Sequence, residues 1–133
     1  VYSFGADFLT SWFGEMQSSR GYRQLRRGPL GRRGYLVAFE SRMSPTGAIA
    51  DEWVQVAPGG EAMAALALGK IVSDQAGIAE LQGFYGAIDA GAMAAAAGVP
   101  AERLEMLARR FLDGPAALAI PGPAVGAGGT MNS

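Results

Sequence analysis

Short apolar runs alternate along this chain with longer segments in which apolar residues recur at helical spacing. The runs predict four β-strands, centred on Val1–Phe4, Tyr35–Phe39, Trp53–Val56 and Ala117–Ile120. Tyr35–Phe39 is apolar at every position, which is typical of a strand in a parallel sheet that helices cover on both faces.

The segments between these runs predict helices. The first helix is expected from four apolar residues at helical spacing, Leu9, Trp12, Phe13 and Met16. Thr10 is its predicted N-cap. The arginine-rich stretch 20–33, which glycine and proline interrupt, is expected to end this helix and to turn.

Further helical segments follow the third predicted strand. One helix is expected at about 61–72, and two loosely specified helices in the alanine- and glycine-rich stretch 75–98. A last helix is expected to begin at Pro100 and to end at Gly114. Ser44–Gly47, before the third strand, is expected to be a turn.

The resulting order, β-α-β-β-α-α-α-β, predicts a doubly wound α/β fold with a mainly parallel sheet, of the Rossmann-like dinucleotide-binding type. A chain of 133 residues suits one domain. Val1 has the pattern of a position inside a strand, and Gly126–Thr130 that of a loop leading further. We therefore expect residues 1–133 to form a single partial domain, truncated at both ends.

Composition narrows the chemistry of this segment. It contains no cysteine and no histidine, so iron–sulfur ligation and nucleophiles or bases of these types are excluded within it. The net charge of −1 does not favour nucleic acid. Arg20, Arg23 and Arg27 share a helical face, which we interpret as a solvated face or a contact with a neighbouring subunit. No apolar run is long enough for a direct membrane span.

Two candidate ligand-binding features follow the first two strands. Gly5 and Asp7 come directly after strand one, where a glycine allows close backbone approach and a following helix N-terminus favours anions. Glu40, with Arg42 nearby, ends strand two, where nucleotide-binding α/β folds hold a ribose hydroxyl. The alternatives are an ordinary turn at Gly5 and a simple Glu–Arg pair at the strand end.

Two further candidates follow the third and fourth strands. Gly59 and Gly60 would expose backbone N–H groups at a helix start, and Glu61 could accept hydrogen bonds from a guanine edge. The alternative is that Glu61 only complements the helix dipole. Gly122 opens a glycine- and proline-rich loop at the same predicted edge, which could equally be a linker.

Taken together, several blocks of this chain resemble the molybdopterin oxidoreductase superfamily. The blocks are Ser3–Phe8, Phe39–Ser44, Ala50–Trp53, Pro58–Glu61 with its alanine-rich helix, Gly98–Glu102 and Leu107–Ala108. They occur in the family's order and cover nearly the whole chain.

The resemblance implies a domain that holds one guanine dinucleotide arm of the molybdenum cofactor. Gly5 and Asp7 would then face the pterin and pyrophosphate, Glu40 the guanosine, and Glu61 the guanine, while the loop from Gly122 would approach the pterin. The family's iron–sulfur cysteines and molybdenum ligand lie upstream of the matching segment. The resemblance thus implies no catalytic residue and no metal ligand in this segment, with iron–sulfur clusters elsewhere in the subunit.

Three departures from the family pattern favour one branch. Cofactor-holding relatives carry Asn where Asp7 stands, Pro where Ser41 stands, and Pro-Gly-Thr-Asp in place of Pro58–Glu61. With these changes, the chain most resembles the large iron–sulfur subunit of alternative complex III, a respiratory complex that oxidises quinol. That subunit is thought to keep the molybdopterin fold without the molybdenum cofactor.

For this branch we expect no bound molybdenum cofactor and partners in a membrane respiratory complex, namely a quinol-binding membrane subunit and cytochrome c subunits. The expected location is membrane-associated, on the periplasmic face of a bacterial inner membrane. One alternative is a catalytic polysulfide or thiosulfate reductase subunit that binds molybdopterin guanine dinucleotide. Others are an unrelated nucleotide-binding module that uses NAD and a scaffold domain without ligand.

Overall fold

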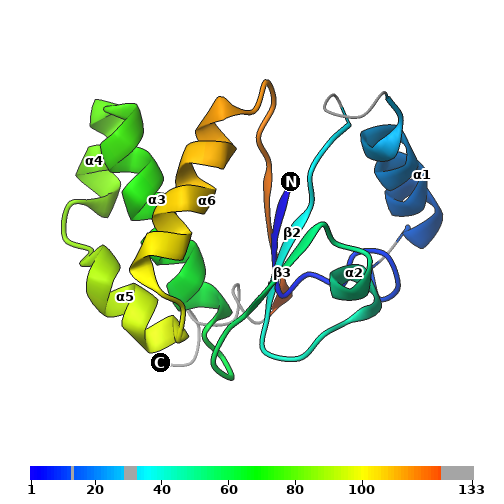
Figure 1. Cartoon of the computed structure of the whole chain (residues 1–133), viewed down its shortest axis with the longest axis horizontal. Coiled ribbons are helices and arrows are strands. Elements are labelled where there is room, and N and C mark those ends of the chain that lie inside the picture. Colours follow the sequence, from blue (N-terminus) through cyan, green and yellow to red (C-terminus); the bar gives the residue numbers. More distant parts are fainter. Residues whose placement is uncertain (13, 29–32, 124–133) are drawn as a thin grey trace.

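The chain forms an α/β structure around one four-stranded sheet, and all three strand pairs in the sheet are parallel (Figure 1). The computed structural model describes residues 1–12, 14–28 and 33–123. The strands are β1 (Tyr2–Phe4), β2 (Val37–Glu40), β3 (Glu52–Gln55) and β4 (Ala119–Pro121), in the spatial order β3-β2-β1-β4. The prediction of a parallel α/β fold is therefore confirmed at this level.

Helices cover both faces of the sheet (Figure 1). One face carries α1 (Glu15–Arg26) and α2 (Pro45–Ala48), and the other α3 (Glu61–Ala76), α4 (Ala79–Tyr85), α5 (Ala90–Ala97) and α6 (Ala101–Asp113). β1 and β2 lie between the two helical layers and are buried at every position. Within the described ranges, no helix is long and apolar enough to cross a membrane.

The main core lies between the sheet and the α3–α6 layer. Phe4 and Phe39 stack at its centre, with ring centroids 4.6 Å apart. Tyr2 reaches across the layer and donates a hydrogen bond from its hydroxyl to the Leu107 carbonyl at 2.7 Å. On the opposite face, Phe8 and Leu36 belong to a smaller buried cluster below α1.

The first helix begins later than the apolar spacing predicts. Thr10 is not an N-cap: its hydroxyl donates to the Asp7 carboxylate, and its backbone N–H donates to the Asp7 carbonyl. The Leu9 N–H donates a hydrogen bond to the Thr46 hydroxyl. These bonds hold the segment in turns, and α1 starts only at Glu15, after Gly14 with its positive φ of 85°. Phe13, part of the predicted pattern, lies outside the described residues.

The other predicted elements are present with shifted bounds. The turn predicted at Ser44–Gly47 is a single turn of helix, α2, in which the Ser44 hydroxyl caps the Gly47 N–H. α3 continues to Ala76, four residues beyond the predicted end, and the stretch after it forms α4 and α5 as two separate helices. The last helix matches its prediction closely.

Candidate functional site

The parallel sheet brings the predicted site residues to one edge. The carboxyl ends of all four strands point to the same side, which is the lower edge in Figure 1. The chain runs outward from β1 through β2 to β3 and then returns to the other flank of β1 as β4. The strand order therefore reverses between β1 and β4, and in parallel α/β sheets ligands bind outside the carboxyl ends of the strands at such a reversal.

Gly5 and Gly122 follow the two strands that flank this reversal, and their backbones touch. The Gly122 N–H donates to the Phe4 carbonyl at 2.8 Å. A Cβ on Gly122 would lie 2.2 Å from the Gly5 carbonyl oxygen, so no other residue fits there without displacement. Here glycine permits the close approach of two loops of the protein itself, and the space directly between β1 and β4 is filled.

Glu61 connects three of the predicted segments. It is the first residue of α3, its side chain is 7% exposed, and its Oε1 accepts the Ser41 N–H at 3.1 Å. Its Cγ would lie 3.3 Å from a Cβ on Gly5. The Glu61 side chain thus lies against the loop after β1, and its carboxylate joins the start of α3 to the residue that follows β2.

Glu40 is turned into the fold. Its side chain is 3% exposed. One carboxylate oxygen accepts the Ser44 hydroxyl at 2.6 Å, and the other accepts the Ser44 N–H at 2.9 Å and the Trp53 indole N–H at 3.3 Å. A Cβ on Gly47 would lie 2.3 Å from the second oxygen, so this glycine makes room for the carboxylate. Glu40 thereby holds the start of α2 against the end of β2.

Asp7 carries a charge at the same edge. Its carboxylate accepts hydrogen bonds from the hydroxyls of Thr46, at 2.6 Å, and Thr10. Burial alone would raise the pKa of Asp7, but the hydrogen bonds from Thr10 and Thr46 outweigh burial and hold this pKa below its ordinary value of 3.8. Asp7 is therefore an anion at neutral pH, and its oxygens are oriented by side chains of this chain.

The glycine pair before α3 is used differently from the prediction. Gly60 does not expose its N–H: it donates to the Ala57 carbonyl at 2.7 Å, and the residue is buried. This hydrogen bond closes the turn that begins at Ala57, so the Gly60 N–H is not available to a ligand, contrary to the prediction. Gly59 is exposed, has a φ of 75°, and would meet nothing within 4 Å if it carried a Cβ. Arg42 is also exposed, at the rim of this edge.

The structure thus places Gly5 beside both Glu61 and Gly122, with Glu40 and Asp7 on the α2 side. Arg42 and Gly59 lie on the surface, and no bond joins them to that group within the described part of the chain. Sequence reasoning missed Ser44 and Thr46, which orient Glu40 and Asp7. A signal was present, because Ser before Pro is typical of a helix N-cap.

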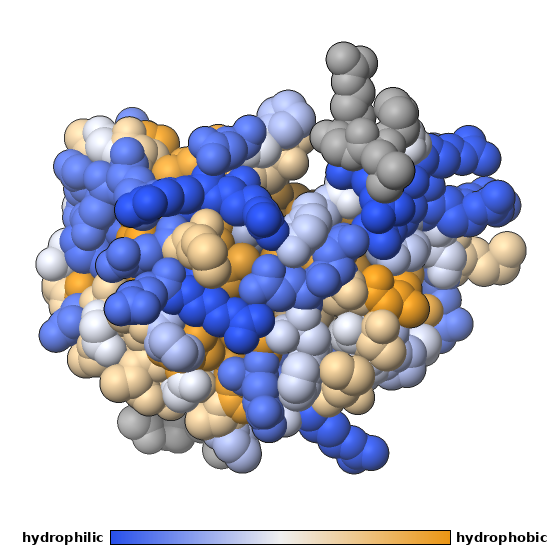
Figure 2. Space-filling model, viewed as in Figure 1, coloured by the Kyte–Doolittle hydropathy of each residue, from blue (hydrophilic) through white to orange (hydrophobic). Residues whose placement is uncertain are grey.

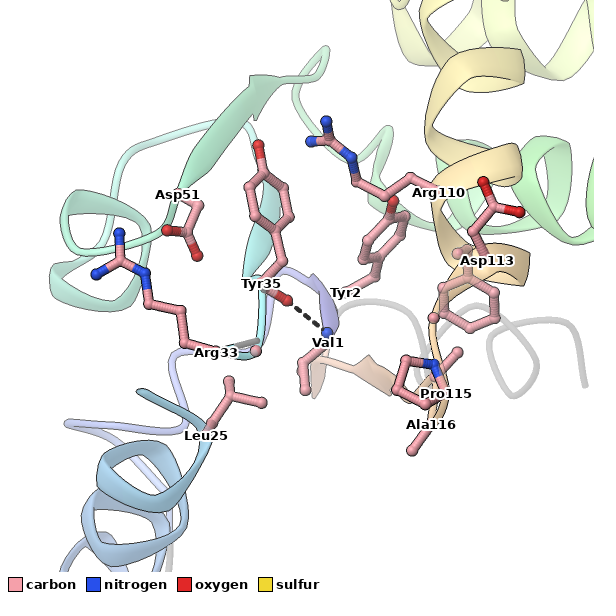
Figure 3. A pocket seen from close by; sticks show the side chains of 14 residues that line it. Val1, Tyr2, Leu25, Arg33, Tyr35, Asp51, Arg110, Asp113, Pro115 and Ala116 are labelled. Atoms are coloured by element: carbon pink, nitrogen blue, oxygen red, sulfur yellow. Dashed lines mark hydrogen bonds between the residues drawn. The ribbon is translucent and has the colours of Figure 1, made fainter. Parts of the chain in front are cut away.

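A hollow lies at the opposite, amino edge of the sheet (Figure 3). It has a volume of about 880 Å³ and lies between β1, the end of α6 and the segment before β2. Arg110 covers one side, with its guanidinium 4.4 Å from the centre of the Tyr35 ring, and Asp51 and Arg33 lie across from it. It contains none of the predicted site residues.

Charged residues at this amino edge bond mainly with one another. Asp51 accepts Arg26 at 2.6 Å, and Glu52 accepts Arg103 at 3.0 Å and lies 3.8 Å from Arg110. These pairs tie β3 to α1 on one face and to α6 on the other. Of the charged residues that line the hollow, Asp51 and Arg110 thus take part in contacts that stabilise the fold.

The described residues include no cluster of three or more Asp, Glu, His or Cys side chains that could hold a metal ion. No known protein-family model matches the chain, and no curated protein matches it either.

Proposed function

We propose that this α/β unit is a Rossmann-like domain in the large subunit of an electron-transfer complex of the molybdopterin oxidoreductase type, and that it serves there as a structural unit without a bound guanine dinucleotide. The family assignment rests on the ordered sequence blocks. The parallel sheet, with Gly5 and Gly122 at its strand reversal, is the architecture that such a domain requires.

The observation that supports a domain without bound cofactor is that the carboxylates of Asp7, Glu40 and Glu61, at the carboxyl edge, are already hydrogen-bonded within the chain. Glu40 and Glu61 accept hydrogen bonds from Ser44, Trp53 and Ser41. Neither therefore presents a free pair of oxygens to a ribose or a guanine.

Asp7 adds a second obstacle to a dinucleotide. Its lowered pKa keeps it charged beside the place where a pyrophosphate would lie. Two like charges about 4 Å apart cost roughly 4 kcal/mol at an effective dielectric near 20. The residues of this edge therefore do not fit the cofactor, and no chemical step is assigned to it.

In the proposed complex, which resembles alternative complex III, electrons from quinol pass through iron–sulfur clusters in other parts of the subunit. This unit would pack those parts and contact neighbouring subunits, namely a quinol-binding membrane subunit and cytochrome c subunits. Its place would be the periplasmic face of a bacterial inner membrane.

The test is elemental analysis of the purified full-length protein for molybdenum and tungsten, together with release of guanine nucleotide after denaturation. We expect neither metal and no guanine nucleotide. Stoichiometric molybdenum or tungsten would overturn the proposal and favour the polysulfide or thiosulfate reductase type. Saturable binding of free NAD would favour an unrelated nucleotide-binding module instead.

A substitution at Asp7 tests the same proposal from the residue side. Asp7→Asn restores the amide of cofactor-holding relatives, and in a cofactor-free protein it should leave quinol oxidation unchanged. A large change in turnover, with the stability of the variant matched to the parent, would contradict a purely structural role.

A further inference from the structure

We infer that the outer face of α1 is a docking surface for an acidic face of another polypeptide. This surface, the arginine stripe, consists of Met16, Arg20, Arg23 and Arg27. The inference rests on the proposed function and deepens it, because it names the chemistry by which this unit would contact a partner subunit.

Met16, Arg20 and Arg23 form one line on the helix, and Arg27, the residue that follows its last turn, continues that line. At 3.6 residues per turn, their positions fall within a sector of about 60°, and Arg20 and Arg27 are about 10 Å apart along the axis. All four side chains are exposed, and Met16 is 73% exposed. The helix has a single acidic residue, Glu15, which lies about 100° away from Met16 around the axis. The stripe is therefore uniformly cationic, with one apolar residue at its amino end.

The arginines of the stripe differ from Arg26 in their contacts within the described residues. Arg26, on another side of the helix, binds Asp51 at 2.6 Å and anchors α1 to the start of β3. By contrast, no ion pair among residues 1–12, 14–28 and 33–123 includes Arg20, Arg23 or Arg27. One arginine thus holds the helix to the protein while three remain available to a partner.

The attachment of α1 to the sheet is slight. None of its residues is buried, and an apolar groove of about 290 Å³ lies between its inner side and β4. Besides the Arg26 bond, two hydrogen bonds hold the helix. The Tyr22 hydroxyl donates to the Ile49 carbonyl at 3.2 Å, and the Leu25 carbonyl accepts the Gly34 N–H at 2.7 Å. A helix that is polar on nearly every side either bridges domains, is stabilised by many ion pairs along its own length, or is not stable by itself. At twelve residues, α1 is also at the margin of stability for an isolated helix.

Positive charge is concentrated in the part of the sequence that contains the arginines of the stripe. The stretch 20–33 contains six arginines, no lysine and no acidic residue, although the whole chain has a net charge of −1. Figure 2 shows strongly hydrophilic side chains at the end of the molecule that α1 occupies, and also over the region of α3 and α6. The guanidinium group forms paired hydrogen bonds with carboxylates, and arginine is enriched in protein interfaces whereas lysine is depleted.

The composition of the stripe favours a polypeptide over nucleic acid or a membrane. Aromatic side chains that could stack on bases are absent from it, since Trp12 and Tyr22 line the groove on the inner side. A helix that inserts into a membrane surface has a broad apolar face, whereas the stripe has only Met16. Carboxylates spaced at three and four residues on a facing acidic helix would match the spacing of Arg20, Arg23 and Arg27.

The experiment measures binding of the full-length protein to a fluorescein-labelled, alanine-based helical peptide that carries Glu at three such positions. We expect saturable binding by fluorescence anisotropy. Replacing Arg20, Arg23 and Arg27 together by Gln should weaken it about tenfold, because exposed ion pairs contribute little individually but add along the stripe. Raising ionic strength from about 0.01 M to about 0.1 M, where the Debye length falls from about 30 to 10 Å, should also weaken it.

Two controls isolate the stripe. Arg109 is exposed on α6, and Arg109→Gln should bind the peptide as the parent does. A peptide with Gln in place of Glu should not bind. Circular dichroism of the triple variant should match the parent, since Gln is a good helix former and the replaced side chains are exposed.

Unchanged binding by the folded triple variant would overturn the inference, and so would equal binding of the Gln peptide. Preferential binding to vesicles containing phosphatidylglycerol, or to single-stranded RNA, would also overturn it if that binding were lost in the triple variant. None of these measurements depends on the molybdenum content. Failure of the docking surface is therefore distinguishable from failure of the cofactor-free proposal.

Discussion

Single carboxylates hold together the connections of this fold. Asp51 is the clearest case, because it accepts both Arg26 at 2.6 Å and the Leu36 N–H at 2.8 Å. It thereby fixes the end of α1 and the entry to β2 with one side chain. Glu40 has the corresponding role for α2, through Ser44 and Trp53.

Acidification should release the Asp51 contacts. Burial alone would raise the pKa of Asp51, but the Arg26 hydrogen bond and the Leu36 N–H outweigh burial and lower this pKa below 3.8. Because the folded-state pKa is depressed, the stabilisation is complete above about 3.8 and is lost as the pH falls through the folded-state value. Urea unfolding followed between pH 6 and pH 2, at about one-unit steps, measures this loss.

Asp51→Asn provides the comparison for that titration. At neutral pH it should lower the free energy of unfolding by about 2 kcal/mol, since a charge-assisted bond is lost and Arg26 remains without its partner. As the pH falls from 3.8 through the lower folded-state pKa of Asp51, the variant and the parent should converge. A constant difference across the whole pH range would show that Asp51 acts through packing alone.

The sequence predicts where these carboxylates lie more reliably than what they bind. Glu40 and Glu61 were predicted at the carboxyl edge from their positions after a strand and before a helix, and the structure places them there. The direction of each side chain could not be predicted, because it depends on partners distant in sequence. Glu61 binds Ser41, twenty residues away, and Asp7 binds Thr46, thirty-nine residues away.

At the scale of elements, the same limit explains the one misplaced helix. The spacing from Leu9 to Met16 satisfies a helical pattern, and local propensity does not oppose it. Asp7, Thr10 and Thr46 form bonds that hold this stretch in turns, and Thr46 belongs to α2. α6, by contrast, was predicted closely because its signals are local: Pro100 before its first turn, an apolar face, and Gly114 at its end.

The docking of β4 depends on Gly122. A Cβ at this position would lie 2.2 Å from the Gly5 carbonyl oxygen, and backbone cannot yield as a flexible side chain can. Gly122→Ala should therefore displace the end of β4 and lower the free energy of unfolding by roughly 1–3 kcal/mol. Chemical denaturation measures the loss, and hydrogen exchange at Tyr2, which donates to the Leu118 carbonyl, reports whether β4 has separated.

Gly83→Ala is the matched substitution for this test. Gly83 lies in α4, where a Cβ would meet nothing within 4 Å. Alanine there should be neutral or stabilising by up to about 1 kcal/mol, because glycine is the weaker helix former. If both substitutions had the same effect, the contact between Gly5 and Gly122 would not be what holds β4.

At the scale of the whole molecule, the two helical layers differ in how firmly they hold the sheet. The α3–α6 layer buries its apolar side chains against β1 and β2 in one continuous core. The α1 and α2 layer rests on a smaller cluster and on polar bonds at the sheet edges. This asymmetry suits a unit that is rigid on one face and offers the other to a partner, as the arginine stripe proposal requires.

Leu104 tests whether the sheet and its major layer unfold as one unit. It is fully buried on α6 in the main core, so Leu104→Ala should lower the free energy of unfolding by about 2–5 kcal/mol. Met106, two residues away, is 64% exposed, and Met106→Ala should change it by less than about 0.5 kcal/mol. In Leu104→Ala, two signals should show the same shifted midpoint. One is tryptophan fluorescence, which reports on Trp53 in β3 and on Trp12 before α1, and the other is far-ultraviolet circular dichroism, which reports mainly on helices. Separate midpoints would mean that the α3–α6 layer unfolds before the sheet does. In that case the strands and the loops between them would be sufficient to maintain the geometry of the carboxyl edge.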